Sequence, residues 1–433
     1  MRTSIKLPKS LVFSNTSMSL LFSTIVVAIQ TIRSHSAFFY SDDYTFIKNQ
    51  SQPISEVFNQ FNGHFMPIIQ VIYRILIGLF GIQSFTPFLV ISGLCNLIFA
   101  FSITYYLRIN QYSRLIIILI PSLLLVVPCS AHTIFWVATA INLLPIGFLL
   151  IHTTLSSQRA LVISTLIFTV FGVGIGGYGL PLVFGLFTYN LLSRKPWPTI
   201  TSIFFLGGTI FIYANFRTPG NLEINKSAIT WILGNFQTLL RSFTPGLSDI
   251  SIINIVMEAI FLIGLVFLSL DIFRYKSWEN QTNNLHTISV LVSLLTFVFM
   301  IAISRGGAES ITASRYVVIG TSLFTLFCLM VCRNFDLRIS KVAFPLKLQH
   351  ILIATLLFSS LFRFFYWWQA PLDINYQSSI NRANVVKAVC ASKEGTDLDI
   401  DYSKIDGLVY LESSLESEVW DKFSVINCKP IGN

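Results

Sequence analysis

Charged residues are scarce in this sequence. Asp, Glu, Lys and Arg together make up 11% of its 433 residues, whereas soluble domains carry about 25%. Hydrophobic residues supply 53% of the chain, and 39 phenylalanines are spread along its length. The shortage of charge excludes a soluble globular protein, and the spread of the apolar residues predicts an all-α polytopic membrane protein.

Acidic residues are fewer than basic ones, 20 against 29, which gives a net charge of +9. In a soluble chain this surplus of cations would suggest a nucleic-acid partner. Here the Lys and Arg residues stand in short connectors between apolar runs, where cations set the orientation of membrane helices. We therefore expect membrane lipids, and no nucleic acid, among the partners.

Two further features are missing. No internal repeat is visible, which argues against the duplicated halves that are common in secondary transporters. Four of the six cysteines fall in or at the ends of apolar runs, and none has the spacing to histidine that a metal site requires. These four are Cys95, Cys129, Cys328 and Cys332.

Apolar runs of about 20 residues predict eleven transmembrane helices. They lie near 12–32, 86–107, 113–130, 133–154, 160–176, 178–193, 199–216, 251–271, 287–304, 316–333 and 348–368. The glycine-rich segment 171–181 interrupts the region 160–193, so a partial hairpin is an alternative there to two full crossings. Because this segment lacks the strand–turn–helix context of a nucleotide loop, it predicts close helix packing or a lipid-tail groove.

The distribution of cations predicts the orientation. With a cytoplasmic N-terminus, the inner connectors hold 14 Lys and Arg residues, and the longer outer connectors before the tail hold eight. The first apolar run follows a basic segment but lacks a clear cleavage site, so we expect an uncleaved first helix. An odd number of spans then puts the C-terminus outside.

Composition changes near Pro371 and divides the chain into a membrane domain, 1–370, and a soluble module, 371–433. The tail holds ten of the 20 acidic residues. Its pattern predicts a small α/β fold with a helix near 375–391 and strands near 407–411 and 423–428. On the outer face, Cys390 and Cys428 would meet an oxidising compartment, where a disulfide between them is expected; two unpaired core thiols are the alternative.

The first outer loop, 33–85, carries the most informative residues. Asp42 and Asp43 stand side by side in a stretch otherwise almost free of acids, and we expect the neighbouring Tyr44, like His64, to bind substrate. From Pro53 onward, apolar residues at helical spacing predict an amphipathic helix that lies flat on the bilayer. His64 then precedes a second apolar helix opened by Pro67, which is either juxtamembrane or a span.

Several arginines also fall on the predicted outer face, although Lys and Arg residues of membrane proteins concentrate in the cytoplasmic connectors. A guanidinium group binds phosphate in a fork and stays charged, so together they suggest a site for an anionic lipid phosphate. Singly, each could extend to lipid headgroups. Glu258 is the acid deepest in an apolar run and is either a structural partner of an arginine or a substrate contact. The residues of this proposed site are Arg217, Arg241, Arg305, Glu309 and Arg315, with Arg363 nearby.

Carboxylates and arginines on one face suggest group transfer from a lipid-phosphate donor. Phosphate leaves as a stable anion when cations hold it. The acceptor hydroxyl needs a base, and one aspartate can take its proton while attack proceeds from the opposite face. The other would orient the acceptor or bind a divalent ion such as Mg²⁺ or Mn²⁺. Helix capping in a solvated connector is the plainer alternative for the pair.

The motifs resemble those of the GT-C superfamily of membrane glycosyltransferases. They are the Asp42-Asp43 pair after an N-in first span, the following amphipathic helix, the turn from His64 to Pro67, and a late Ser-Arg-Tyr at 314–316. Within the superfamily, the chain is similar to bacterial serotype-converting O-antigen glucosyltransferases. It is shorter than protein O-mannosyltransferases and oligosaccharyltransferases, and its tail is too small to match their soluble domains.

The resemblance implies an inverting transfer of one hexose, such as glucose, from a polyprenyl-phosphate carrier to a surface polysaccharide or lipid-linked glycan. It places this reaction on the outer face of the bacterial inner membrane, downstream of a donor synthase and a flippase. By the same resemblance, Asp42 or Asp43 is the base or a metal ligand. Arg315 then belongs to the donor-phosphate site, beside Tyr316.

Two other functions compete with this one. An O-antigen polymerase also has about a dozen spans and outer arginines, and it would depend on the arginines instead of the aspartates. A lipid or glycan transporter would place charged residues through the middle of several spans. This chain has few of these beyond Glu258 and Arg363.

Overall fold

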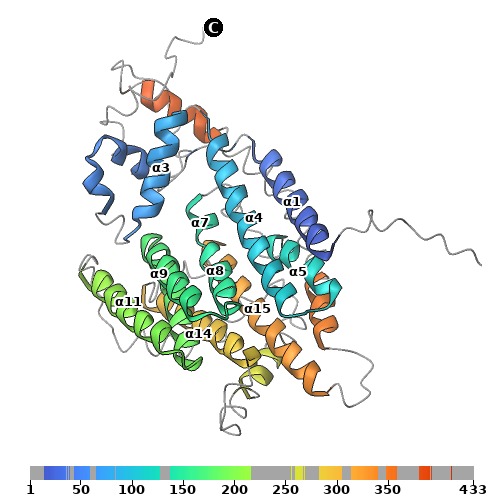
Figure 1. The fold of residues 1–433 in the computed structure, drawn as a ribbon. Coiled ribbons are helices and arrows are strands. Elements are labelled where there is room, and N and C mark those ends of the chain that lie inside the picture. The colour runs from blue at the N-terminus through green and yellow to red at the C-terminus, as the bar shows by residue number, and fades with distance from the viewer. Residues whose placement is uncertain are drawn as a thin grey trace, which may run out of the picture.

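The computed structural model is mostly helical in the part that is described, and the described residues include no strand (Figure 1). The described residues are 14–35, 37, 39, 43–58, 65–82, 84–126, 137–215, 255, 259–266, 268, 282–304, 314–339, 348–357, 380–390, 392 and 411.

Ten labelled helices of the described part form the bundle, and the first loop contributes α2, α3 and two short 3₁₀ segments. The bundle helices are α1 (Asn15–Arg33), α4 (Thr86–Ile109), α5 (Arg114–Val126), α7 (Val137–Ile141), α8 (Leu144–Thr153), α9 (Gln158–Gly174), α10 (Leu180–Leu192), α11 (Pro196–Asn215), α14 (Thr282–Ser304) and α15 (Ser314–Ile339). The loop elements are α2 (Asp43–Lys48), η2 (Asn49–Ser51), η3 (Ile54–Phe58) and α3 (Pro67–Phe80). Two further helices are Leu348–Leu357 and 380–390.

Each of the eleven predicted spans contains helix in its described part. Four described helices are long and apolar enough to cross a membrane, namely Asn15–Arg33, Thr86–Ile109, Asn284–Ile301 and Val318–Asp336. A polytopic all-α membrane fold is therefore supported, and the count of eleven crossings stays a prediction. The fourth predicted span is broken, because α7 ends at Ile141 and α8 begins only at Leu144.

Local sequence explains where the helices begin. Proline occupies the first turn of α3, α4, α8 and α10, where its missing N–H would have no intrahelical partner. Ser14 and Ser157 cap α1 and α9, each accepting a backbone N–H at 3.1 Å through its hydroxyl oxygen. At the other end of α3, Gly81 adopts a positive φ of 69°.

The glycine-rich segment forms a tight turn between two separate helices, α9 and α10. Gly176 has a φ of +94°, and the 3₁₀ turn η4 (Gly177–Gly179) follows it. A Cβ atom on Gly179 would overlap the carbonyl oxygen of Gly172, and one on Gly174 would overlap Ile68 of α3. Close helix packing, one of the two predicted uses of this segment, is thus confirmed.

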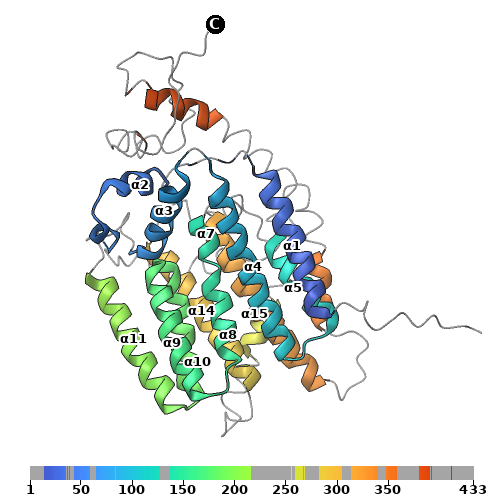
Figure 2. The ribbon, with the colours of Figure 1, turned by 45° about the horizontal axis from the view of Figure 1, so that its top comes forward.

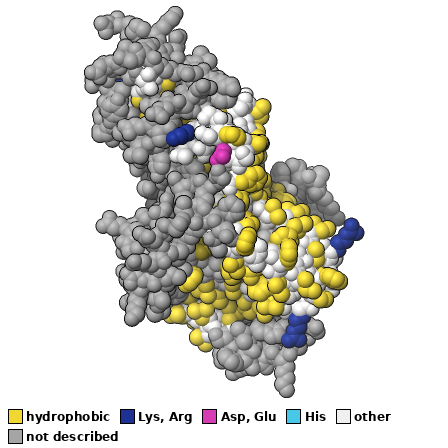
Figure 3. Space-filling view, turned by 90° about the vertical axis from the view of Figure 1, so that its left-hand side faces the viewer, with side chains coloured by type: hydrophobic (Ala, Val, Ile, Leu, Met, Phe, Trp, Pro, Cys, Tyr) yellow, Lys and Arg dark blue, Asp and Glu magenta, His cyan; other side chains and the backbone are white. Residues whose placement is uncertain are grey.

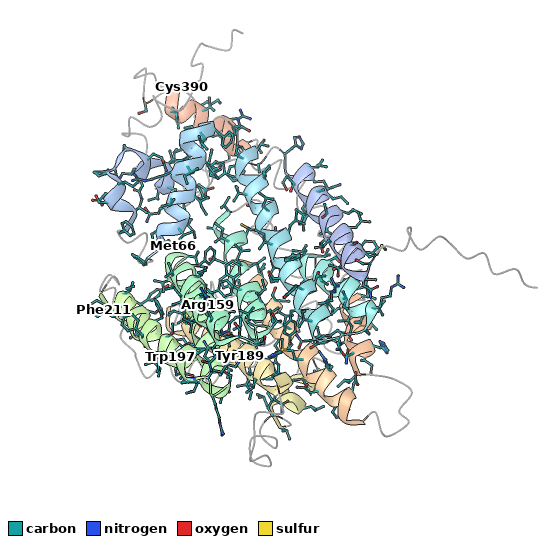
Figure 4. All side chains as sticks on the ribbon, in the orientation of Figure 1. Met66, Arg159, Tyr189, Trp197, Phe211 and Cys390 are labelled. Atoms are coloured by element: carbon teal, nitrogen blue, oxygen red, sulfur yellow. The ribbon has the colours of Figure 1, made fainter. Side chains whose placement is uncertain are left out.

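Within the bundle, α10 packs against α14, α1 packs against α5 and α4, and α14 packs against α15. Large apolar side chains remain exposed on the outside of the bundle. On α11 they include Trp197 and Phe211, exposed by 65% and 66% (Figure 4). Figure 3 shows apolar side chains gathered on the side that carries α11, with Lys and Arg at the edge of this area. Such a surface suits contact with lipid tails.

Two predictions about the loop and tail need correction. The amphipathic segment after Pro53 is a five-residue 3₁₀ turn in its described part, with Val57 buried and Ile54 and Phe58 exposed. In the tail, residues 380–390 are helical as predicted, but Leu411, at the end of the predicted strand 407–411, is helical and fully buried. Leu411 belongs to the same buried apolar cluster as Tyr44 and Tyr73. The rest of both predicted strands lies outside the described residues.

Candidate functional site

Asp43 is the first residue of α2, and its side chain is completely buried. The hydroxyl group of Tyr73, on α3, donates a hydrogen bond to Oδ1 of Asp43. Burying a carboxylate is costly unless its oxygens accept hydrogen bonds. Tyr73 offsets part of this cost and fixes the direction of the carboxyl group, which the sequence did not predict.

Aromatic rings surround this pair. The ring of Phe46 stacks on Tyr73 with centroids 4.4 Å apart, and Phe88 of α4 lies 5.1 Å from the same ring. Phe39 contacts both Phe85 and Phe88 edge to face, at 5.0 Å each. These rings exclude water, and a hydrogen bond in such surroundings is stronger than one in water.

Tyr44, the residue after Asp43, points away from solvent and is fully buried. Its hydroxyl donates to the carbonyl oxygen of Phe39 at 2.8 Å. The side-chain amide of Asn381, from the tail helix 380–390, donates to the same carbonyl at 2.9 Å and to the Tyr44 hydroxyl at 3.1 Å. The Tyr44 hydroxyl thus links the loop to the tail, and a substrate contact of Tyr44 stays a prediction.

Arg74 fixes the turn that follows α2. Its guanidinium donates to the carbonyl oxygens of Asn49, Gln52 and Pro53 at 2.7, 3.0 and 3.2 Å. Burial lowers the pKa of Arg74, and the nearby negative charge of Glu56 partly opposes this effect. The Arg74 guanidinium therefore binds the backbone of the turn directly after α2, the helix that begins with Asp43.

Most of the other predicted site residues lie outside the described part of the chain. They are Asp42, His64, Arg217, Arg241, Glu258, Arg305 and Glu309. Arg315 and Tyr316 fall in the first turn of α15, where only the backbone is described. Of the predicted site residues, the structure therefore describes the side chains of Asp43 and Tyr44, and the arginine cluster stays a prediction.

The direction of α15 bears on Arg315. Near the other end of this helix, the guanidinium carbon of Arg333 lies 4.2 Å above the ring centroid of Tyr112, just before α5 begins. The first turn of α15 therefore points toward the end of the bundle at which α4 begins and α2 lies. We call this the loop end; it also carries the helix 380–390 (Figure 2).

Cys390, the last residue of that helix run, is part of a disulfide (Figure 4). Cys95, Cys328 and Cys332 are free and buried. The two remaining cysteines, Cys129 and Cys428, lie outside the described residues. An oxidised Cys390 agrees with the predicted disulfide, whose pairing with Cys428 stays a prediction.

A second polar cluster lies inside the bundle, away from the loop end. His152 contacts the Ser164 hydroxyl through Nδ1 at 2.7 Å and the side-chain oxygen of Asn190 through Nε2 at 3.0 Å. The amide nitrogen of Asn190 donates to Thr165 at 2.9 Å and to Ser202 at 2.7 Å. These contacts tie α8, α9, α10 and α11 together, and hydrogen bonds of this kind join helices in membranes.

Sequence reasoning missed Tyr73, Arg74 and Asn381. The first two interrupt the apolar run of α3, which is a signal that could have been used. Asn381 gives no signal, because its role depends on the docking of a distant segment. Within the described residues, no group of three or more His, Cys, Asp or Glu side chains is placed to hold a metal ion.

Comparison with known proteins finds no relative of this chain. No protein-family model matches it, and neither does any curated protein or solved structure. The resemblance to GT-C glycosyltransferases thus depends on the sequence motifs described above.

Proposed function

We propose that this protein is a membrane glycosyltransferase that moves one sugar from a polyprenyl-phosphate donor to a glycan acceptor. The observation that carries the proposal is the buried carboxylate of Asp43, held by the Tyr73 hydroxyl at the start of α2. This carboxylate is shielded from water, and contacts from both α2 and α3 fix its position. An active site needs charged groups that are held in place in this way.

In the proposed reaction, a carboxylate of the Asp42-Asp43 pair takes the proton of the acceptor hydroxyl. The acceptor oxygen forms a bond to the anomeric carbon of the sugar while the bond from that carbon to the phosphate oxygen breaks. The electron pair leaves with the polyprenyl phosphate, so the configuration inverts. General base catalysis of this kind contributes roughly 10²–10⁴ in rate.

We assign different tasks to the two aspartates. Asp43 is buried and accepts the Tyr73 hydrogen bond, which suits a group that positions the loop. Asp42, its neighbour in the sequence, is then the proton acceptor. Mg²⁺ or Mn²⁺ remains an option for this carboxylate pair, since both ions prefer oxygen ligands.

The proposed donor site uses Arg315 at the beginning of α15, together with Arg217, Arg241 and Arg305. The support for Arg315 is the direction of α15, whose first turn points to the loop end. We place this end outside the cytoplasmic membrane, with the N-terminus of α1 inside, because more cations fall in the connectors at the opposite end.

Transport is less well supported. A transporter needs polar groups that are free to exchange partners along a path. The cluster around His152 and Asn190 instead uses both histidine nitrogens and the whole Asn190 amide within the bundle. A polymerase remains the second candidate, because it would use the same predicted outer arginines.

The test compares surface glycans from cells that express the wild type, Asp42→Asn, Asp43→Asn or the control Glu56→Gln. Glu56 is a carboxylate of the same loop that interacts with Arg74. Mass analysis should find one added hexose per repeat with wild type and control, and none with Asp42→Asn. A change in chain length instead would favour a polymerase. Full hexose addition by both Asn variants would refute the proposal.

A further inference from the structure

The helix 380–390 lies across the first loop at the loop end, although some 340 residues separate the two in sequence (Figures 1 and 2). One face of this helix is buried. Val385, Ala388 and Val389 belong to the same apolar cluster as Tyr44 and Tyr73. The tail helix therefore shares a core with the loop that carries Asp43, which a separate appended module would not do.

Asn381 adds a polar contact to this core. Only 5% of the residue is exposed, and its amide nitrogen bridges the Phe39 carbonyl and the Tyr44 hydroxyl at 2.9 and 3.1 Å. The Tyr44 hydroxyl donates to the same carbonyl at 2.8 Å. The three groups form a closed triangle that joins the backbone before α2, the first turn of α2 and the tail.

This triangle reaches Asp43 through short connections. Tyr44 follows Asp43 directly in the first turn of α2, so the two cannot move independently. On the other side, Asp43 accepts a hydrogen bond from the Tyr73 hydroxyl. The Tyr73 ring packs on Phe46, which lies in α2 with Asp43. With six residues, α2 is too short to be stable alone and depends on these tertiary contacts.

We propose that the tail helix 380–390 is a clasp that holds α2 in place, with Asn381 as the residue that positions the Asp43 carboxylate. Removing the Asn381 amide leaves the Phe39 carbonyl and the Tyr44 hydroxyl with one donor fewer in a buried place. Local opening of α2 then becomes more frequent while the bundle stays folded.

The same helix offers a matched control. Asn384 is also buried, but its amide nitrogen donates at 3.1 Å to the carbonyl oxygen of Ile380, within its own helix. Asn381→Leu and Asn384→Leu therefore introduce the same side chain one helical turn apart. Of the two amides, Asn381 is the one that bonds to Phe39 and Tyr44.

The experiment measures hydrogen–deuterium exchange of the peptide covering α2 in the full-length protein, purified in detergent micelles. We expect Asn381→Leu, which removes both donated hydrogen bonds, to raise the exchange rate at least about tenfold. With Asn384→Leu, the rate should stay within about twofold of the wild type. Equal effects of the two variants, or none, would overturn the clasp.

Two additions keep the result decisive. If Asn381→Leu does not fold, Tyr44→Phe removes the hydroxyl that Asn381 contacts, keeps the ring, and should raise exchange in the same peptide. Unchanged exchange of this peptide in Tyr44→Phe would show that the clasp is wrong. Sugar transfer is measured in parallel, because the effect of this contact on catalysis rests on the proposed function. In Asn381→Leu, kcat should fall with the KM for donor unchanged.

The two proposals fail in different ways. Faster exchange in Asn381→Leu with no sugar transfer in any variant, wild type included, would keep the clasp and remove the glycosyltransferase. Unchanged exchange with active wild type would keep the enzyme and remove the clasp. A fall in kcat in both Leu variants would assign Asn381 a general structural role and overturn its positioning role.

Discussion

The Tyr73 hydroxyl hydrogen-bonds to the carboxylate of Asp43, thirty residues earlier in the chain. This contact joins α3 to α2 inside a shell of aromatic rings. It helps to explain how an acidic residue can be completely buried in an apolar chain, and it links the two helices of the loop.

Tyr73→Phe should destabilise the protein, because it leaves a buried carboxylate oxygen without this donor. We expect a loss of about 1–3 kcal/mol. Thermal unfolding in detergent measures it, with Tyr105→Phe on α4, a residue that is 37% exposed, as the control. In a double-mutant cycle with Asp43→Asn, the two losses should not be additive. Strict additivity would contradict the coupling.

Gly179→Ala should prevent normal packing of α9 against α10. The added Cβ would overlap the Gly172 carbonyl oxygen, and backbone cannot move aside cheaply. We expect a cost above about 3 kcal/mol and a loss of monodisperse protein in size-exclusion chromatography. Gly207→Ala, in the middle of α11 with open space around it, should be neutral or slightly stabilising. Equal yields of the two variants would rule out the tight turn.

Asn190→Leu should loosen the four helices that meet at this side chain. It removes two donated hydrogen bonds and the partner of His152 Nε2. Hydrogen bonds between membrane helices are worth about 0.6 kcal/mol on average, so the expected loss is roughly 1–3 kcal/mol. Unfolding in sodium dodecyl sulfate measures it. Asn110→Ala, which affects a bond to the Tyr106 carbonyl within one helix end, should cost less.

Cys390 should become a free thiol in Cys428→Ser and stay blocked in Cys129→Ser. Because Cys95, Cys328 and Cys332 are free, only Cys428 and Cys129 remain as partners of Cys390 within the chain. A maleimide reagent of high mass, added to unfolded and unreduced protein, reports the number of free thiols by a gel shift. A new thiol at position 390 in Cys129→Ser would reverse the predicted pairing.

Labelling with a membrane-impermeant maleimide tests the orientation. Ser55→Cys, at an exposed position in η3, should react in intact spheroplasts, whereas Gln158→Cys at the start of α9 should react only after the membrane is opened. Position 43 is unsuitable for this purpose because it is fully buried. Reaction of Gln158→Cys alone in closed spheroplasts would invert the topology.

Helices were predictable because their signals are local. Runs such as 86–107 carry their own length and apolarity, and prolines such as Pro87 and Pro181 mark where helices begin. The break at Asn142 was missed, although Pro145 in the first turn of α8 is a signal of the same kind.

The candidate site was predictable only in part. The Asp42-Asp43 pair stands out in a chain with few acids, which is why Asp43 was found. Its burial was unexpected, because a carboxylate in an outer loop normally faces water. Tyr73 and Asn381 come from α3 and the tail, and one sequence does not reveal that these segments meet.

The contact between Asn381 and Phe39 joins residues 342 positions apart. Ribosomes make proteins from the N-terminus, so the first loop waits unfinished until nearly the whole polypeptide has been synthesised. A chain cut short by a premature stop codon would insert its helices yet lack the last brace of its loop. Proteases that survey the membrane surface would then have an open segment to attack.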